Sequence, residues 1–576
     1  MLVVVGEDYG EGASVIQERT HAYALKSSML LLDPRPDLAQ MVHMVEHGFR
    51  LSEASNMPAI MELRIRACHV RGSFEAKDNI APAISTHHLL DEPAGFDYMR
   101  LAHPPVTFRH EKLKGDERIP AARRYIVEHG LNELREGRHA DLGLIVQGGL
   151  YNTLIRALQQ FGLADAFGHT DIPMLVLNVT CPLVPEQLTN FCLGKRAVLL
   201  LEEGQPEYIE QELATLLRRL DIQTPLHGKD MLPRAGEYTT LVMMKGIRKF
   251  LQRYAPALLE MAPVDSGVAA MLAPKVIPLI PSMPGVALQE APGVLPRPPS
   301  FCTGCPERPL FTAIKLVERE IGKHYVSADI GCHQFAALAP FDFGATSMGY
   351  GLGAAGAAAL NVEGAGRRTI SVMGDGGVWH NGLTSGVGNA VFNKSDNLIV
   401  VVDNGYSAAT GGQDILSSRA KNDKRTTKMS IEGAVRGTGV NWIRTVSNTY
   451  NLKKMKAAVR EALTTSDRGP KVLIAQSECM LNKQRRVKPL MRKQIAQGER
   501  VVTERFGIDS DTCTGDHSCI RLSGCPSLSI RPNPDPLRKD PIAVVQSSCV
   551  GCGLCGEVSH AAVLCPSFYR TELVSN

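Results

Sequence analysis

The chain has 576 residues, a formal net charge of +4, and a composition that is 44% hydrophobic and 21% charged. This length predicts about three to five domains, and the ordinary composition excludes a disordered chain. The small net charge argues against nucleic-acid binding, and no apolar run approaches the ~18 residues that a membrane span needs.

Strand-like apolar runs alternate with amphipathic helical stretches through most of the chain. The expected strands are Leu2–Val5, Leu142–Val146, Met174–Val179, Ala197–Leu201, Thr369–Met373 and Leu398–Val402. The expected helices include Tyr151–Phe161 and Glu207–Leu217. Such alternation favours an α/β fold of doubly wound parallel sheets. A Pro-rich stretch, 256–300, predicts a linker between two α/β domains, and a charged stretch, 480–510, predicts a connector to a C-terminal module.

The fourteen cysteines are the most informative residues, and seven of them lie between positions 513 and 565. The apolar start of the chain is too short for a secretory signal, so we expect a cytoplasmic, reducing location. There, cysteines serve metal or redox chemistry more often than disulfides. Three cysteines match no motif and are expected to be core residues: Cys68, Cys181 and Cys192.

A phosphate and metal motif lies at the ends of two expected strands. Gly374-Asp375-Gly376-Gly377 ends one strand, and Asn404 follows the next, 29 residues after Asp375. Parallel strands joined by a helix place their carboxyl ends at one sheet edge, where such folds bind ligands. The oxygens of Asp375 and Asn404 suit Mg²⁺ bridging a diphosphate, and the glycines allow close approach to phosphates. Two ordinary strand–turn junctions are the alternative.

The C-terminal cysteines resemble bacterial ferredoxin ligand runs. Cys549, Cys552 and Cys555 form a C-x₂-C-x₂-C run, although nine residues rather than three separate Cys555 from the following Cys565-Pro566. In two-cluster ferredoxins the Cys-Pro cysteine ligates the other cluster. This rule assigns Cys525, which precedes Pro526, to the same [4Fe–4S] cube as the C-x₂-C-x₂-C run. Structural zinc on these cysteines is the alternative.

The second cube of the tail is less regular, because Asp516 stands where the middle cysteine is expected. We predict Cys513, Asp516, Cys519 and Cys565 as its ligands, since a carboxylate can replace a thiolate. The alternatives are His517 as a ligand, or a three-iron cluster.

A further C-x₂-C pair begins the domain that carries the phosphate motif. Cys302 and Cys305 form the pair, and Cys332 and Cys479 lie further along the chain. Together the four could hold a third cluster. A lone C-x₂-C turn with two unrelated buried thiols is the alternative.

These features together resemble the 2-oxoacid:ferredoxin oxidoreductases, and within them the indolepyruvate-type alpha subunits. The resemblance implies thiamine diphosphate and Mg²⁺, the metal being held by Asp375, Asn404 and the carbonyl of Tyr406. It also implies a proximal cluster on the four cysteines of the C-x₂-C domain. The segment Ser347-Met348-Gly349 resembles the one that supports the aminopyrimidine ring.

The resemblance also implies a domain order. Residues 1–75 resemble part of a pyrimidine-binding domain, and its first half, with the activating glutamate, is expected to be missing. Glu7 or Glu11 could replace that glutamate, and the loop Gln17–Arg19 is expected to approach the substrate. The remaining segments are 76–139 (connecting), 140–235 (transketolase C-terminal-like), 236–299 (linker), 300–480 (diphosphate-binding), 481–512 (connector) and 513–576 (two-cluster ferredoxin-like).

The implied reaction is oxidative decarboxylation of an aryl 2-oxoacid, such as indolepyruvate, to an acyl-coenzyme A. Electrons would pass through the clusters to ferredoxin, and a smaller beta- or gamma-type subunit would complete a hetero-oligomer. The alternatives are an oxidoreductase for pyruvate or branched-chain oxoacids, and a non-catalytic remnant that binds cofactors or transfers electrons.

Overall fold

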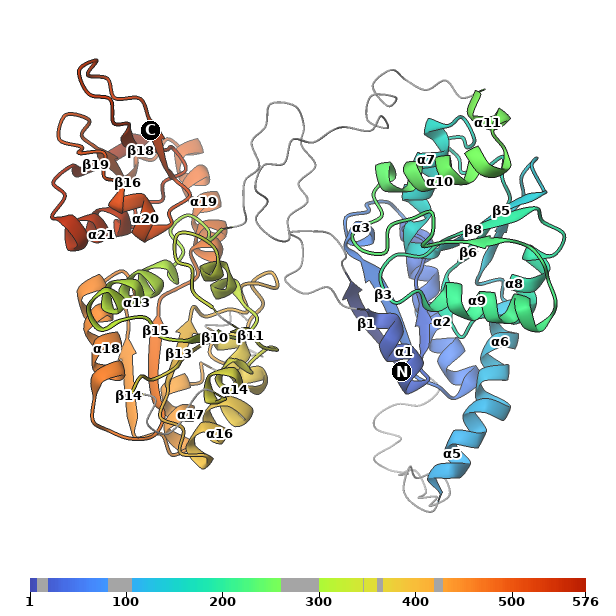
Figure 1. The fold of residues 1–576 in the computed structure, drawn as a ribbon, viewed down its shortest axis with the longest axis horizontal. Coiled ribbons are helices and arrows are strands. Elements are labelled where there is room, and N and C mark those ends of the chain that lie inside the picture. Colours follow the sequence, from blue (N-terminus) through green and yellow to red (C-terminus); the bar gives the residue numbers. More distant parts are fainter. Residues whose placement is uncertain are drawn as a thin grey trace. The chain divides into compact units, whose positions relative to one another are not determined.

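A computed structural model describes residues 1–7, 19–80, 106–260, 300–344, 346–359, 366–418 and 428–575. The chain divides into two compact units, Met1–Gln289 and Glu290–Asn576. Both are built around mainly parallel sheets flanked by helices, so the predicted α/β class is confirmed (Figure 1). None of the helices in these ranges combines the length and apolar character needed to cross a bilayer.

The first sheet of unit 1 has the strand order β1-β3-β2-β7. Strands β1 and β2 both run parallel to β3, and β7 is antiparallel to β2. Helices α2 and α6 pack on this sheet through an apolar core that includes Met44, Leu51 and Ile126. The elements are β1 (Leu2–Glu7), α1 (Thr20–Ser27), β2 (Leu30–Leu32), α2 (Leu38–Ser55), β3 (Ala59–Arg64), α3 (Ile65–Cys68), α5 (Thr107–Leu113), η2 (Lys114–Arg118), α6 (Ile119–Glu128) and β7 (Val179–Cys181).

The second sheet of unit 1 has the order β4-β6-β5-β8-β9 and buries strands β5, β6 and β8 completely. Its elements are β4 (Glu133–Arg135), β5 (Leu142–Gln147), η3 (Gly148–Leu150), α7 (Tyr151–Gln160), β6 (Met174–Leu177), α8 (Pro185–Cys192), β8 (Ala197–Leu201), α9 (Tyr208–Arg219), β9 (Leu226–His227), α10 (Thr240–Tyr254) and α11 (Ala257–Glu260).

Two parts of unit 1 differ from the expected domain limits. Strand β7 follows β6 directly in the chain but joins the first sheet, so the two sheets share the segment 140–235. Helix α10 lies within the expected linker 236–299, yet it packs on α7 because Met243, Ile247 and Phe250 are buried in the core of the second sheet. The Pro-rich part of that linker, 261–299, falls outside the described residues.

Unit 2 contains a six-stranded sheet of order β11-β10-β12-β13-β15-β14, in which every pair of neighbours is parallel. Its strands are β10 (Val326–Ala328), β11 (Thr346–Ser347), β12 (Ile370–Gly374), β13 (Leu398–Asp403), β14 (Trp442–Val446) and β15 (Lys471–Gln476). Its helical segments are α13 (Arg308–Ile321), η4 (Cys332–Ala337), α14 (Gly353–Ala358), α15 (Asp375–Gly377), η5 (Val378–Gly388), α16 (Asn389–Phe392), α17 (Ile431–Gly437) and α18 (Leu452–Thr464).

The expected connector 481–512 is largely regular structure. Helix α19 (Met480–Ala496) is rich in Lys, Arg, Gln and Leu, which favour helices. Strand β16 (Val501–Ile508) then pairs antiparallel with β19 (Phe568–Ser575), so it belongs to the cysteine-rich tail. The tail also contains α20 (Ser518–Ser523), β17 (Leu528–Arg531), β18 (Ile542–Val545) and α21 (Leu554–Val563). Leu522 and Leu554 extend into the core of the six-stranded sheet, so the tail packs on this domain.

Candidate functional site

Asp375 begins the helical segment that follows β12, at the carboxyl edge of the unit 2 sheet. Its carboxylate accepts hydrogen bonds from the backbone N–H groups of Gly376 (2.9 Å), Asn404 (2.9 Å) and Gly405 (2.6 Å). The two strand ends therefore meet, as the parallel pairing of β12 with β13 requires. Burial, and then the charge of Asp403, raise the pKa of Asp375 well above its usual value. A cation would offset both effects, so the site fits Mg²⁺.

Asn404 is buried beside Asp375 and shapes the turn after β13. Its Oδ1 accepts a hydrogen bond from the Tyr406 N–H at 3.2 Å, and its Nδ2 donates to Glu307 Oε1 at 3.4 Å. Gly405 between them has φ +83°, a left-handed conformation that favours glycine. The three residues predicted to hold Mg²⁺ thus occupy one tight turn and the neighbouring strand end.

The glycines next to Asp375 pack too closely for a side chain. A Cβ at Gly376 would lie 2.0 Å from the Tyr350 hydroxyl oxygen, and one at Gly377 would lie 2.1 Å from Oδ2 of Asp329. That same Oδ2 accepts the Gly351 N–H at 2.7 Å. The backbone after β12 and the Gly349–Gly351 turn consequently pack closely together through Asp329 and Tyr350.

The segment Ser347-Met348-Gly349 begins at the last residue of edge strand β11. The Met348 N–H donates to the Ala328 carbonyl at 2.8 Å, and Ser347 Oγ accepts a hydrogen bond from Gln334. A mostly apolar cavity of about 290 Å³ lies beside Ser347, lined also by Phe311, Val326, His333, Phe343 and Val372. The expected contact of this segment with an aminopyrimidine ring stays a prediction.

The four cysteines of the C-x₂-C domain come together at the same edge. Burial, together with the nearby Glu307, Cys479 and Cys302, raises the pKa of the Cys332 thiol, and burial raises that of Cys305, which also interacts with Cys332. Loops before α13, after β10 and after β15 supply these thiols. An anionic iron–sulfur cluster needs such a set, so the residues fit a cluster at this position.

Glu307 was missed by sequence reasoning, although it follows Cys305-Pro306 directly. It is fully buried, burial raises its pKa, and its Oε2 has no hydrogen-bond partner among the described residues. Its Oε1 binds Asn404, while its charge acts on Cys305 and Cys332. Glu307 therefore lies between the Asp375 edge and the four thiols. A single acidic residue after a C-x₂-C-Pro turn carries no pattern that could have predicted this.

The first tail set also converges. Burial, and then Cys525, Cys552 and Cys549, raise the pKa of the Cys555 thiol. The Gly551 N–H donates to the Cys549 sulfur at 3.4 Å. Cys555 thus lies near the three cysteines that the Cys-Pro rule groups with it, and their assignment to one cube stays a prediction.

The residues of the second tail set line a small cavity. They are Cys513, Asp516, Cys519 and Cys565, and His517 lines it with them. Burial raises the pKa of Cys519 to about 12, and Cys513, Cys565 and Asp516 add to the effect. The Asp516 carboxylate accepts hydrogen bonds from Ser518 N–H (2.6 Å) and Thr514 Oγ1 (2.8 Å). His517 Nε2, in contrast, is buried with no partner among the described residues. Among the residues that the structure describes, no three His, Cys, Asp or Glu side chains are placed to hold a single metal ion.

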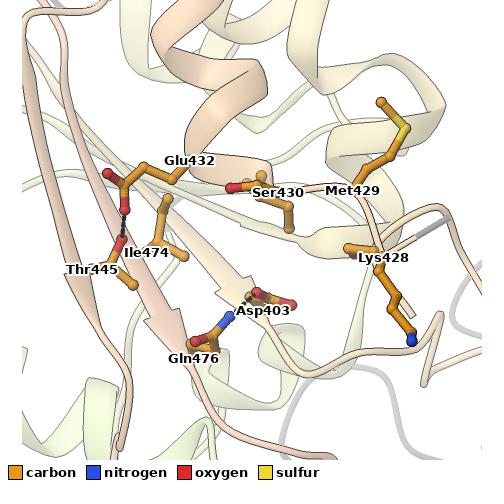
Figure 2. Close-up of a pocket in the computed structure, with 10 residues that line it drawn as sticks. Asp403, Lys428, Met429, Ser430, Glu432, Thr445, Ile474 and Gln476 are labelled. Atoms are coloured by element: carbon orange, nitrogen blue, oxygen red, sulfur yellow. Dashed lines mark hydrogen bonds between the residues drawn. The ribbon is translucent and has the colours of Figure 1, made fainter. Parts of the chain in front are cut away.

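A pocket of about 600 Å³ lies beside Asp403 at the sheet edge (Figure 2). The Gln476 side chain donates to Asp403 Oδ2 at 2.7 Å, and the Thr445 hydroxyl donates to Glu432 at 2.7 Å elsewhere in the lining. Because Asp403 directly precedes Asn404 at the end of β13, this pocket adjoins the predicted Mg²⁺ site. Lys428 lies on its rim.

In unit 1, the carboxyl ends of the strands carry a buried ionic cluster. Arg64 pairs with Asp33 (2.9 Å), Glu62 (3.2 Å) and Glu203, all almost fully buried. Glu7 ends β1 among these groups and accepts the Thr20 N–H at 3.0 Å. Glu11 and Gln17 lie outside the described residues, whereas Arg19 pairs with Glu202 at 2.6 Å. Of the three unassigned cysteines, Cys192 is buried and Cys181 half-buried, but Cys68 is exposed, so its expected core position is wrong.

Comparison with known proteins agrees with this geometry. Residues 329–475 match the family model "Thiamine pyrophosphate enzyme, C-terminal TPP binding domain". The chain is 27% identical to indolepyruvate oxidoreductase subunit IorA of Methanothermobacter thermautotrophicus, covering 98% of this chain and 81% of that protein. It is also 27% identical to the subunit IorA of Thermococcus kodakarensis, covering 97% and 80%.

Among solved structures, a 2-oxoglutarate:ferredoxin oxidoreductase from Magnetococcus marinus aligns with a TM-score of 0.28 and 20% identity. The alignment covers 32% of this chain and 65% of the Magnetococcus chain. The expected resemblance is therefore confirmed by sequence: the chain contains a thiamine pyrophosphate enzyme C-terminal domain and is similar, over nearly its whole length, to indolepyruvate oxidoreductase subunits IorA.

Proposed function

We propose that this chain is the thiamine- and electron-carrying subunit of a 2-oxoacid oxidoreductase that acts on aryl 2-oxoacids such as indolepyruvate. The observation that supports this most is the contact between Asn404 and Glu307, because it joins the predicted Mg²⁺–diphosphate edge to the four thiols of the C-x₂-C domain. When bound, thiamine diphosphate supplies the carbon nucleophile and electron sink that decarboxylation of a 2-oxoacid requires.

The chain's own residues then have distinct tasks. Asp375, Asn404 and the Tyr406 carbonyl would hold Mg²⁺ and thereby the diphosphate, beside the backbone of Gly374, Gly376 and Gly377, which carries no side chains. Ser347, Met348 and Gly349 would contact the ring end of the cofactor.

Three sets of ligands would hold [4Fe–4S] clusters, which would carry electrons away from the cofactor. The proximal set is Cys302, Cys305, Cys332 and Cys479; the next is Cys525, Cys549, Cys552 and Cys555; the last is Cys513, Cys519 and Cys565 with Asp516 or His517. Ferredoxin accepts the electrons, coenzyme A accepts the acyl group, and a smaller subunit completes a hetero-oligomer. The cytoplasm is the compartment in which these thiols stay reduced for cluster assembly.

The test is an anaerobic assay of the purified chain, alone and with its smaller subunit. Thiamine diphosphate, Mg²⁺ and coenzyme A are supplied with indolepyruvate or pyruvate, and acyl-coenzyme A and acceptor reduction are measured. We expect turnover that prefers indolepyruvate and is abolished by Cys305→Ala, whereas Cys68→Ser, at an exposed cysteine of unit 1, stays active. Full iron and thiamine content without turnover of either oxoacid would overturn the proposal in favour of a non-catalytic remnant.

A further inference from the structure

Arg308 is a fully buried cation with few partners. It begins helix α13, three residues after Cys305. Among the described residues it is the largest side chain that is fully buried. Its Nη1 donates to the Ser523 carbonyl at 3.1 Å, but its Nε and Nη2 are buried without a hydrogen-bond partner among the described residues. A buried charge with unsatisfied donors is strongly unfavourable unless an anion compensates it.

The groups that interact electrostatically with Arg308 are sulfurs rather than carboxylates. Cys525 and Cys552 act most strongly on it, followed by Cys305 and the hydroxyl of Tyr450. Cys525 and Cys552 belong to the first tail set, and Cys305 belongs to the proximal set. Arg308 is therefore next to both predicted clusters at once, and thiolates that ligate iron would supply the missing negative charge.

The packing around Arg308 shows that the two cysteine loops touch. Thr303, within the C-x₂-C turn, lies 3.1 Å from the Ser527 hydroxyl, which in turn lies 2.8 Å from the Ser548 hydroxyl. Gly304 has φ +72°, and a Cβ there would lie 2.4 Å from a methyl carbon of Val550. The proximal turn is consequently seated directly on the loops that carry Cys525, Cys549 and Cys552.

We propose that Arg308 is a positioning residue shared by the proximal cluster and the adjacent tail cluster, and that its two free donors bind their sulfurs. This inference rests on the proposed function, because it requires that the cysteines hold clusters. A fixed positive charge stabilises the reduced, more negative state of a cluster, so Arg308 raises the reduction potential. The effect is larger for the tail cluster, since Cys525 and Cys552 interact with it most strongly.

The first test is a redox titration of the assembled protein followed by electron paramagnetic resonance. In Arg308→Met we expect the reduction potential of the tail cluster to fall by about 59 mV. At a fixed solution potential, this corresponds to an about tenfold change in the ratio of oxidised to reduced cluster for a one-electron couple. Arg308→Lys keeps the charge and shifts the potential less. The control is Arg368→Met, at a mostly buried arginine paired with Asp396 at 3.1 Å, which should leave the potential unchanged.

Iron and sulfide contents separate the possible failures. A wild-type chain without iron would refute the proposed function, whereas fully loaded Arg308→Met with unshifted potentials would overturn the role of Arg308. If Arg308→Met loses iron while Arg308→Lys keeps it, the need for the charge is supported.

A second test uses the cluster-free chain. There, Arg308→Met removes an uncompensated buried charge and should leave the thermal midpoint unchanged or raise it, while it lowers the midpoint of the loaded chain. A residue that only fills space would lower both midpoints, and that result would contradict the inference.

Discussion

The replacement Asp375→Asn tests the predicted Mg²⁺ site with almost no change in shape. In the structure, one carboxylate oxygen accepts the Gly376 N–H, and the other accepts the Asn404 and Gly405 N–H groups. An asparagine presents one oxygen and one NH₂ group. Whichever way it is oriented, at least one buried backbone N–H faces another donor and loses its acceptor.

The magnitude follows from these contacts. A hydrogen bond to a charged group contributes about 1.5–3 kcal/mol, and a buried donor left unsatisfied costs about 1–3 kcal/mol. Part of this loss is offset in the cofactor-free chain, because burial and Asp403 already disfavour the Asp375 charge. We therefore expect unfolding to become easier by about 1–3 kcal/mol. Removal of one member of a buried charge pair costs about 2–5 kcal/mol in binding, so affinity for thiamine diphosphate with Mg²⁺ should fall at least about thirtyfold.

Calorimetric titration of thiamine diphosphate, with and without Mg²⁺, measures this effect. Asp342→Asn is the matched control, since the Asp342 side chain is 69% exposed in the same unit and should bind the cofactor like wild type. If Asp375→Asn keeps both the affinity and its dependence on Mg²⁺, the assignment of Asp375 as the metal ligand is wrong.

Three further predictions concern other parts of the chain. Arg64→Met leaves three buried carboxylates of unit 1 without their shared cation, so denaturant unfolding should show a loss of about 3–5 kcal/mol, and a loss below about 1 kcal/mol would contradict the ionic cluster. Burial alone would raise the pKa of Asp396, but hydrogen bonds from Lys471 and a neighbouring arginine lower it. Because the folded pKa lies below the unfolded one, Asp396→Asn should lower the thermal midpoint at pH 7, and this difference should vanish as the pH falls below the ordinary aspartate value of about 3.9; a pH-independent difference would refute the ion pair. His517→Ala should change the paramagnetic spectrum of the last tail cluster more than Asp516→Ala does, since only the histidine has a free buried nitrogen, and the reverse order would identify the carboxylate as the ligand.

The apolar pattern of the sequence predicted strands well wherever their structure depends on residues within the same segment. The expected strand Ala197–Leu201 matches β8, and the runs before Asp375 and Asn404 form β12 and β13 with bounds shifted by about a residue. The charges of the stretch 481–512 predict a solvated connector. The structure forms helix α19 there, whose charged side chains are compatible with exposure, and strand β16, whose partner β19 lies near the far end of the chain.

Strand ends and glycine turns could be predicted from the sequence because they depend on residues a few positions apart, and cysteine spacing gave candidate ligand sets that stay predictions. Which distant groups meet depends instead on how the whole chain packs. Glu307 lies between Asn404 and the thiols, and Arg308 lies between two cysteine sets, because helix α13 and the tail share one core. Burial makes such residues consequential: a charge that water would screen at the surface must find its partners inside the protein.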